Sequence, residues 1–148
     1  MRLLFRSIGI ATGILVLAGV QSASAQIANA VEFTTSFPFT VGNATVPAGS
    51  YTIRPDGDNP AVFEVTGAHE SVLFEANSAQ ARETPSKTEV VFRRYGEGYV
   101  LKNIWVEGSE IGAEATTVEA ERHVAKRHAL EGEQRIEARQ QTDTGGYR

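Results

Sequence analysis

An alternation of apolar and polar side chains over residues 31–41 constrains the fold of this chain more than any other feature. The odd positions hold Val, Phe or Thr, and the even positions hold Glu, Thr, Ser or Pro. Successive side chains of a β-strand point to opposite faces, so this pattern predicts a strand that buries Phe33, Phe37 and Phe39 together. Pro38 has no N–H to donate, so we expect the strand to be outermost or broken at its middle.

Short β-rich runs separated by turn-forming residues continue along the chain as far as residue 106. They predict two early hairpins, a surface loop over residues 77–88 and a hairpin at Gly96-Glu97-Gly98. Apolar residues on both faces of 99–106 indicate a strand that is covered on both sides. We expect the core to contain these aromatic residues: Phe37, Phe39, Phe63, Phe74 and Phe92. The predicted fold is mainly β, an antiparallel β-sandwich or small barrel of about seven or eight strands over residues 26–115.

The pattern changes after Gly112. Thr116 or Thr117 can cap a helix, and the sequence predicts one C-terminal helix over residues 116–130. Its apolar stripe is thin, so the helix should rest weakly on the sheet. Charged residues and glutamine dominate residues 131–148, which we expect to form a polar, flexible tail.

Residues 1–25 have the features of a secretory signal peptide. Arg2 and Arg6 precede an apolar run, and Ala23-Ser24-Ala25 supplies the small side chains that signal peptidase requires before Gln26. The alternative is a membrane anchor, but the run is shorter than the ~20 residues that span a bilayer. We therefore expect cleavage between Ala25 and Gln26, a secreted or periplasmic protein, and no stable membrane anchor after cleavage.

Charge and cysteine content narrow the classes of function. Cleavage would leave 123 of the 148 residues, enough for one domain, and with no cysteine its stability must come from packing. Removing two arginines leaves 12 basic residues against 18 acidic ones, a net charge of about −6. We expect no nucleic-acid partner, because binding to phosphate backbones calls for a basic face.

The motifs of common catalytic and metal sites are missing from the sequence. His123 and His128 are five residues apart, so one helix face cannot present both to a metal ion. The loop Asp56-Gly57-Asp58-Asn59 lacks the later glutamate of an EF-hand, since Gly67 occupies that position. We predict no catalytic residue, no cofactor and no metal ligand. A hydrolase or ligand-carrying pocket whose residues converge only in three dimensions, with His69, Arg93, Arg94 and the nearby acids, stays an alternative.

Three cations are expected to lie close together on neighbouring strands. Pairing about the turn at residues 96–98 brings Arg93 within a step or two of Lys102, beside Arg94. Like charges at this distance repel each other unless an anion lies between them. Either acids of an adjacent strand supply it (Glu64, Glu75 or Glu89), or Arg93, Arg94 and Lys102 form an anion-binding patch for lipid headgroups, acidic polysaccharide or a carboxylate ligand.

Residues 37–53, FPFTVGNATVPAGSYTI, are similar to the pattern F-x-F-x-V-G-x-x-x-L-P-A-G-x-Y-x-I. With this opening, the chain resembles a family of small secreted bacterial β-proteins of unknown function. VFRRYG at 91–96 and LKNIW at 101–105 resemble its segment F-x-R-Y-G-x-x-Y-x-L-x-x-I-W, and ERHVAKR at 121–127 resembles its helix. The resemblance covers residues 30–128 and implies membership of this family, but it assigns no catalytic role to any residue.

We expect an exported, non-enzymatic β-module of the cell envelope or exterior, with a structural role or an unknown envelope or extracellular partner. The alternative is a secreted hydrolase or small-ligand-binding protein with a pocket that the sequence does not reveal. A core filled by aromatic side chains would favour the first, and an apolar cavity with a few converging polar groups would favour the second.

Overall fold

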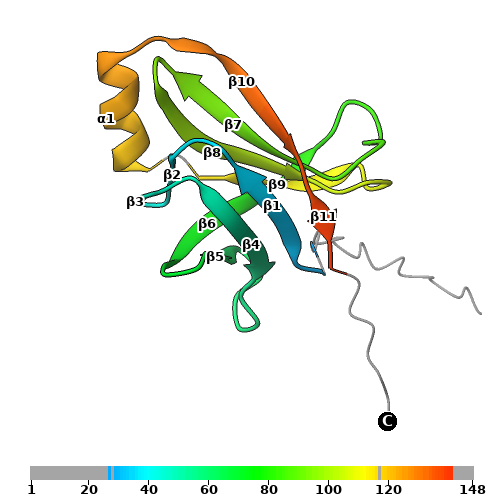
Figure 1. Cartoon of the computed structure of the whole chain (residues 1–148). Helices are drawn as coiled ribbons and strands as arrows, with labels where there is room; N and C mark the ends of the chain where they lie inside the picture. The colour runs from blue at the N-terminus through cyan, green and yellow to red at the C-terminus, as the bar shows by residue number, and fades with distance from the viewer. Residues whose placement is uncertain (1–26, 28, 117, 142–148) are drawn as a thin grey trace, which may run out of the picture.

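A computed structural model describes residues 27, 29–116 and 118–141, so the expected signal peptide and its cleavage residues Ala25 and Gln26 lie outside the described residues. The described part of the chain is mainly β, with eleven strands and one helix (Figure 1). The elements are β1 (Val31–Thr35), β2 (Phe39–Val41), β3 (Ala44–Val46), β4 (Gly49–Pro55), β5 (Val62–Thr66), β6 (Ser71–Gln80), β7 (Glu89–Tyr95), β8 (Gly98–Trp105), β9 (Ile111–Ala115), α1 (Glu119–Arg127), β10 (Leu130–Glu137) and β11 (Arg139–Gln140).

All eleven strands belong to one sheet, in the order β10-β7-β8-β9-β6-β5-β4-β1-β11. Outside this order, β2 pairs with β8, and β3 pairs with β2. The sheet is mixed because β2 pairs with β8 in parallel, through Thr40 and Val100, while the other pairs are antiparallel. The prediction of a mainly β chain with one helix is confirmed. The count exceeds the seven or eight strands expected, because the 31–41 strand is divided and β9, β10 and β11 have weak apolar patterns.

Strand β6 joins the two parts of the sheet that enclose the core. Residues 71–75 pair with β5, and residues 76–80 pair with β9. Figure 1 shows β6 crossing between the lower part, with β1, β4 and β5, and the upper part, with β7, β8 and β9. At the other side, β10 pairs with β7, and β11 pairs with β1. Only Ala138 separates β10 from β11 along the chain.

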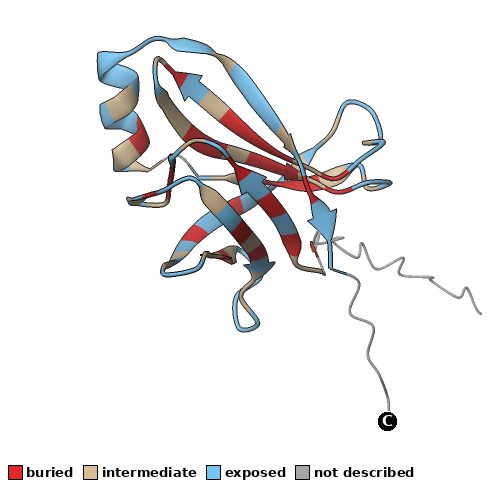
Figure 2. Ribbon diagram, viewed as in Figure 1, coloured by how far each residue is buried: buried red, intermediate tan, exposed pale blue. Residues whose placement is uncertain are grey.

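Aromatic side chains fill the space between the two parts of the sheet. Phe39 lies at the centre, with ring centroids 5.1 Å from Phe92, 5.2 Å from Tyr51 and 6.0 Å from Phe33. Buried residues recur along most strands, while β10 and β11 contain none (Figure 2). Of the five phenylalanines expected in the core, four are buried: Phe39, Phe63, Phe74 and Phe92.

The alternation predicted for residues 31–41 is present, and so is the break at its middle. Val31 and Phe33 are buried while Glu32 is exposed, and β1 ends before Pro38. The Thr35 hydroxyl donates a 2.7 Å hydrogen bond to the carbonyl oxygen of residue 37, which turns the chain here. As a result Phe37 is only partly buried, and it stacks on Tyr99 at a centroid distance of 3.8 Å.

The C-terminal region differs from its prediction. The helix covers residues 119–127 rather than 116–130, and Val118 at its N-cap makes no side-chain capping bond. Residues 130–140, mostly assigned to a flexible tail, form β10 and β11 instead. The tail prediction was wrong here because β10 pairs with β7 through backbone groups while its side chains are mostly exposed, so no apolar pattern marks it. In the described residues, the helix is too short and polar to cross a membrane.

Candidate functional site

One buried carboxylate attaches helix α1 to the sheet. Glu121 is the only buried residue of the helix, at 4% exposure. Its Oε1 accepts a 2.8 Å hydrogen bond from Arg93 Nη1 and a 3.0 Å hydrogen bond from the Tyr95 hydroxyl, both on β7. Arg93 Nη2 also donates to Glu114 Oε1 on β9 at 3.4 Å. Buried charges need such partners, and this group connects α1, β7 and β9.

The protonation states in this group are stabilised by the same contacts. Burial acts to lower the pKa of Arg93, but the hydrogen bond and charge of Glu121 outweigh burial, so the pKa is raised. The pKa of Tyr95 is also raised, first by burial and then by the hydrogen bond to Glu121. Arg93 therefore stays charged and Tyr95 stays protonated at neutral pH, which keeps both as donors to the helix.

The three cations of the predicted anion-binding patch each have a carboxylate partner in the structure. Arg93 bonds to Glu121, Arg94 Nε lies 3.5 Å from Glu131 Oε2, and Lys102 bonds to Glu133. The hydrogen bond from Lys102 lowers the pKa of Glu133. Arg93, Arg94 and Lys102 thus take part in a charge network across β7, β8 and β10.

The acids that pair with these cations come from elements that the sequence did not place nearby. Glu64 bonds to Arg54, and Glu89 lies within 3.4 Å of Lys87 and 3.1 Å of Arg135, so neither serves the predicted patch. The acids used instead belong to α1, β9 and β10. Sequence reasoning missed Glu121 because a glutamate among charged helical residues has the same pattern as a solvated one.

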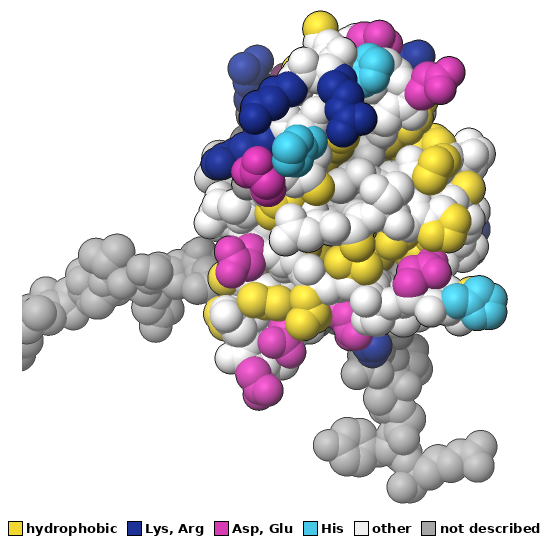
Figure 3. Space-filling model, turned by 90° about the vertical axis from the view of Figure 1, so that its left-hand side faces the viewer, with side chains coloured by type: hydrophobic (Ala, Val, Ile, Leu, Met, Phe, Trp, Pro, Cys, Tyr) yellow, Lys and Arg dark blue, Asp and Glu magenta, His cyan; other side chains and the backbone are white. Residues whose placement is uncertain are grey.

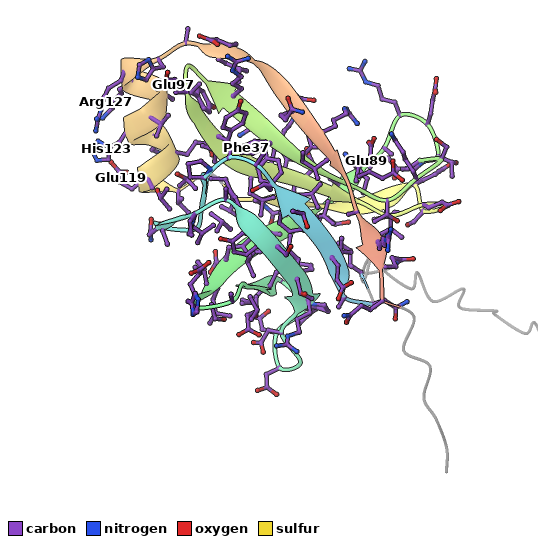
Figure 4. The ribbon with its side chains drawn as sticks, viewed as in Figure 1. Phe37, Glu89, Glu97, Glu119, His123 and Arg127 are labelled. Atoms are coloured by element: carbon purple, nitrogen blue, oxygen red, sulfur yellow. The ribbon has the colours of Figure 1, made fainter. Side chains whose placement is uncertain are left out.

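The outward face of α1 carries the cations that the helix does not use for its attachment. Arg122, Lys126 and Arg127 are exposed, and Figure 3 shows dark-blue side chains gathered over the helix. Glu119 lies 3.6 Å from Arg122 and 3.5 Å from His123. Within the described residues, no carboxylate lies in ion-pair distance of Lys126 or Arg127. Glu119, His123 and Arg127 point away from the sheet (Figure 4).

A cleft of about 380 Å³ lies beside the C-terminal end of α1. Its walls come from the helix and from the β7–β8 turn. The lining residues are Tyr95, Gly96, Glu97, Gly98, Val124, Arg127 and His128. Gly96 has a φ of 60°, which a tight turn requires and which favours glycine, so the turn can approach the helix end closely. Arg127 thus belongs both to the cleft and to the outward face.

The three histidines do not meet in the structure. His69 is exposed in the β5–β6 turn, while His123 and His128 lie in and just after α1. Over residues 27–141, leaving out 28 and 117, no three side chains of His, Cys, Asp or Glu form a group that could hold a metal ion. Asp56 lies in the turn after β4, and its N–H donates to the carbonyl oxygen of Val62 at 2.8 Å.

Comparisons with known proteins give this chain no relative to argue from. No protein-family model matches it, and neither the curated proteins nor the solved structures contain a significant match. What the chain does must therefore be inferred from its own geometry.

Proposed function

We propose that this chain is an exported, non-enzymatic β-module that binds an anionic partner through the outward face of α1. The observation that carries this proposal is the attachment, through a buried carboxylate, of a cationic helix face to an acidic protein. Lys126 and Arg127 have no carboxylate partner among the described residues, while the buried Glu121 holds the helix in place. A face that is positioned before binding loses little entropy when the partner arrives.

The filled interior supports surface binding over an internal ligand site. The rings of Phe33, Phe39, Tyr51 and Phe92 lie within 6.0 Å of a neighbouring ring and occupy the centre of the core. A carrier of an internal ligand would need an apolar cavity in this position. The clefts border the outer surface instead, in keeping with a partner that stays outside.

Export is part of the proposal. The pattern of residues 1–25 supports a cleavable signal peptide, which would place the module in the periplasm or outside the cell. The resemblance to small secreted bacterial proteins points to the same location. The whole chain has a net charge of −4, so a cationic face is a local positive region on a negatively charged protein.

Binding of mature protein to anionic and neutral surfaces tests the proposal. We expect binding to phosphatidylglycerol vesicles or to a soluble acidic polysaccharide, weakening as salt is added, and none to phosphatidylcholine vesicles. Lys126→Ala/Arg127→Ala should weaken the binding about 10- to 30-fold, since each cation near an anionic surface contributes about 1 kcal/mol.

The control is Arg54→Ala/Arg139→Ala, which removes the same charge from exposed positions outside α1. Equal weakening in both double variants would show that net charge rather than the α1 face governs binding. Absence of binding to both anionic probes at low salt would overturn the proposal. The two probes also distinguish a lipid headgroup from an acidic glycan as the source of the negative charge.

A further inference from the structure

A second cleft, of about 570 Å³, lies at the end of the sheet opposite α1. In Figure 1 this is the right-hand side, where the loop after β6 and the turn between β8 and β9 lie together. The lining residues are Gln80, Ala81, Arg82, Glu83, Thr84, Pro85, Ser86, Lys87, Glu89, Trp105 and Arg135. The cleft combines one large aromatic side chain with many hydrogen-bonding groups, as binding sites for small polar ligands do.

Trp105 is the single tryptophan of the chain and lines this cleft. Its indole lies against Gly112 of the neighbouring strand β9, where a Cβ atom would come within 2.4 Å of the ring carbon Cε3. Gly112 therefore leaves room for the six-membered ring of the indole against the backbone of β9. An indole supported in this way is a fixed apolar surface at the edge of a polar cleft.

The loop that forms the outer wall is held in place by the β8–β9 turn. The N–H of Ala81 donates to the carbonyl oxygen of Glu110 at 2.7 Å, and the N–H of Gly108 donates to the carbonyl oxygen of Pro85 at 2.9 Å. The Thr84 hydroxyl donates to Glu110 Oε1 at 3.1 Å. The cleft is thus formed before any ligand arrives, which reduces the entropy lost on binding.

Charges of both signs surround the indole. Glu89 is the cross-strand neighbour of Trp105, and its carboxylate accepts from Arg135 Nη1 at 3.1 Å and lies 3.4 Å from Lys87 Nζ. Arg82 and Glu83 on the loop are exposed. The cleft therefore presents both acceptors and donors, and the shared carboxylate offsets part of the positive charge. This arrangement suits a neutral ligand with many hydroxyl groups better than an ion.

We propose that this cleft binds a hexopyranose unit of a neutral glycan chain. The apolar C–H face of the sugar ring lies on the Trp105 indole, and its hydroxyls exchange hydrogen bonds with Glu89, Arg82 and the neighbouring polar side chains. The cleft opens to the surface, so the rest of the glycan chain extends away from the protein. This site is independent of the α1 face and of the anionic partner proposed above.

Tryptophan fluorescence tests the proposal directly, because Trp105 is the only tryptophan of the chain and lines this cleft. The mature protein is titrated with four neutral oligosaccharides: cellotetraose, tetra-N-acetylchitotetraose, maltotetraose and mannotetraose. We expect a saturable change in emission with at least one of them, in the millimolar range or below. No saturable change with any of the four, confirmed by calorimetry, would overturn the proposal.

Two kinds of variant locate the binding. Trp105→Ala, which removes the only tryptophan and is therefore followed by calorimetry, should abolish binding. Arg82→Ala/Glu83→Ala, on an exposed loop, should weaken it about tenfold while leaving the unfolding midpoint unchanged. Because Trp105→Ala can destabilise the fold, the loop variant is decisive: unchanged affinity there would overturn the site. Lys126→Ala/Arg127→Ala is the matched control and should keep full sugar affinity. Failure of the sugar site can therefore be distinguished from failure of the anionic partner proposed for α1.

Discussion

Arg93 on β7 and Glu121 on α1 are 28 residues apart in the chain and share a 2.8 Å hydrogen bond that determines where the helix lies. The same carboxylate oxygen accepts from Tyr95, so one atom holds two donors of one strand. The helix buries no other residue, which makes this polar contact the main link between the helix and the sheet. Apolar packing contributes little there, because only Ala120 and Val124 among the apolar residues of α1 are even partly buried.

Replacement of Glu121 by alanine should therefore destabilise the protein by about 2–4 kcal/mol, because it leaves Arg93 and Tyr95 without their shared acceptor. Urea denaturation measures this loss. Glu119→Ala, an exposed position of the same helix, should cost less than about 0.5 kcal/mol. Similar losses for the two variants would mean that the buried pair does not hold the helix.

Truncation of the two neighbouring aromatic residues should have unequal effects. Phe39→Ala should cost about 3–5 kcal/mol, because the ring is almost fully buried among other aromatic rings, and Phe37→Ala should cost less, about 1–3 kcal/mol. Equilibrium unfolding of both, with Leu73→Ala at an exposed position as control, measures the order. A larger loss for Phe37→Ala than for Phe39→Ala would contradict the observed burial.

The Tyr51 hydroxyl should make stability depend on pH in alkali. Burial first, and then the hydrogen bond and charge of Glu70, raise its pKa from 10.0 to about 12. A pKa raised on folding stabilises the protein fully below pH 10.0, and this contribution disappears as the pH rises through about 12. Unfolding midpoints measured over this interval should fall more steeply for the wild type than for Tyr51→Phe. Parallel curves would rule out Tyr51 as the titrating group.

Removal of the last two strands should be far more damaging than the sequence suggests. A chain that ends at Ala129 lacks β10 and β11 and exposes the edge of β7, where Val90 and Phe92 are fully buried in the intact protein. We expect it to aggregate or to unfold at a much lower temperature, because an unpaired apolar edge recruits other chains. A chain that ends at Gln141 keeps both strands and serves as the control. Equal melting temperatures for the two would support the flexible-tail prediction instead.

Processing of the N-terminus should depend on the small side chain before the expected cleavage site. In the native host, the exported protein should begin at Gln26, and Ala25→Arg should block cleavage because a large charged side chain cannot enter the peptidase pocket. Mass analysis of the N-terminus distinguishes the two forms. An exported wild-type protein that retains Met1 would contradict a cleavable signal peptide.

The strands that could be predicted are those whose side chains alternate between core and solvent. The alternation that includes Phe33 and Phe39 predicted β1 and β2, and Pro38 predicted the break between them. Strand β10 could not be found, since an edge strand pairs through its backbone and Glu131 to Glu137 contains only one large apolar side chain. Its position depends on β7, a partner that is distant in the sequence.

The candidate sites, too, could be predicted only in part from the sequence. Arg93 could be picked out from the sequence because it lies in a recognisable strand, but its partner Glu121 lies on another element, and nothing local relates the two. The Trp105 cleft also depends on a loop that the Thr84–Glu110 hydrogen bond holds in place. The Arg93–Glu121 and Thr84–Glu110 contacts join residues 28 and 26 positions apart, which only the topology of the sheet brings together.

The pairing of Val31 with Gln140 brings the first strand of the sheet against the last one. Contacts between segments so distant in the sequence form late, because the ordering of the intervening chain must precede them, and folds with many such contacts fold slowly. The sheet is therefore incomplete until the final residues of the chain are available. We therefore expect a chain with this strand order to stay unfolded for longer than one that folds through local contacts.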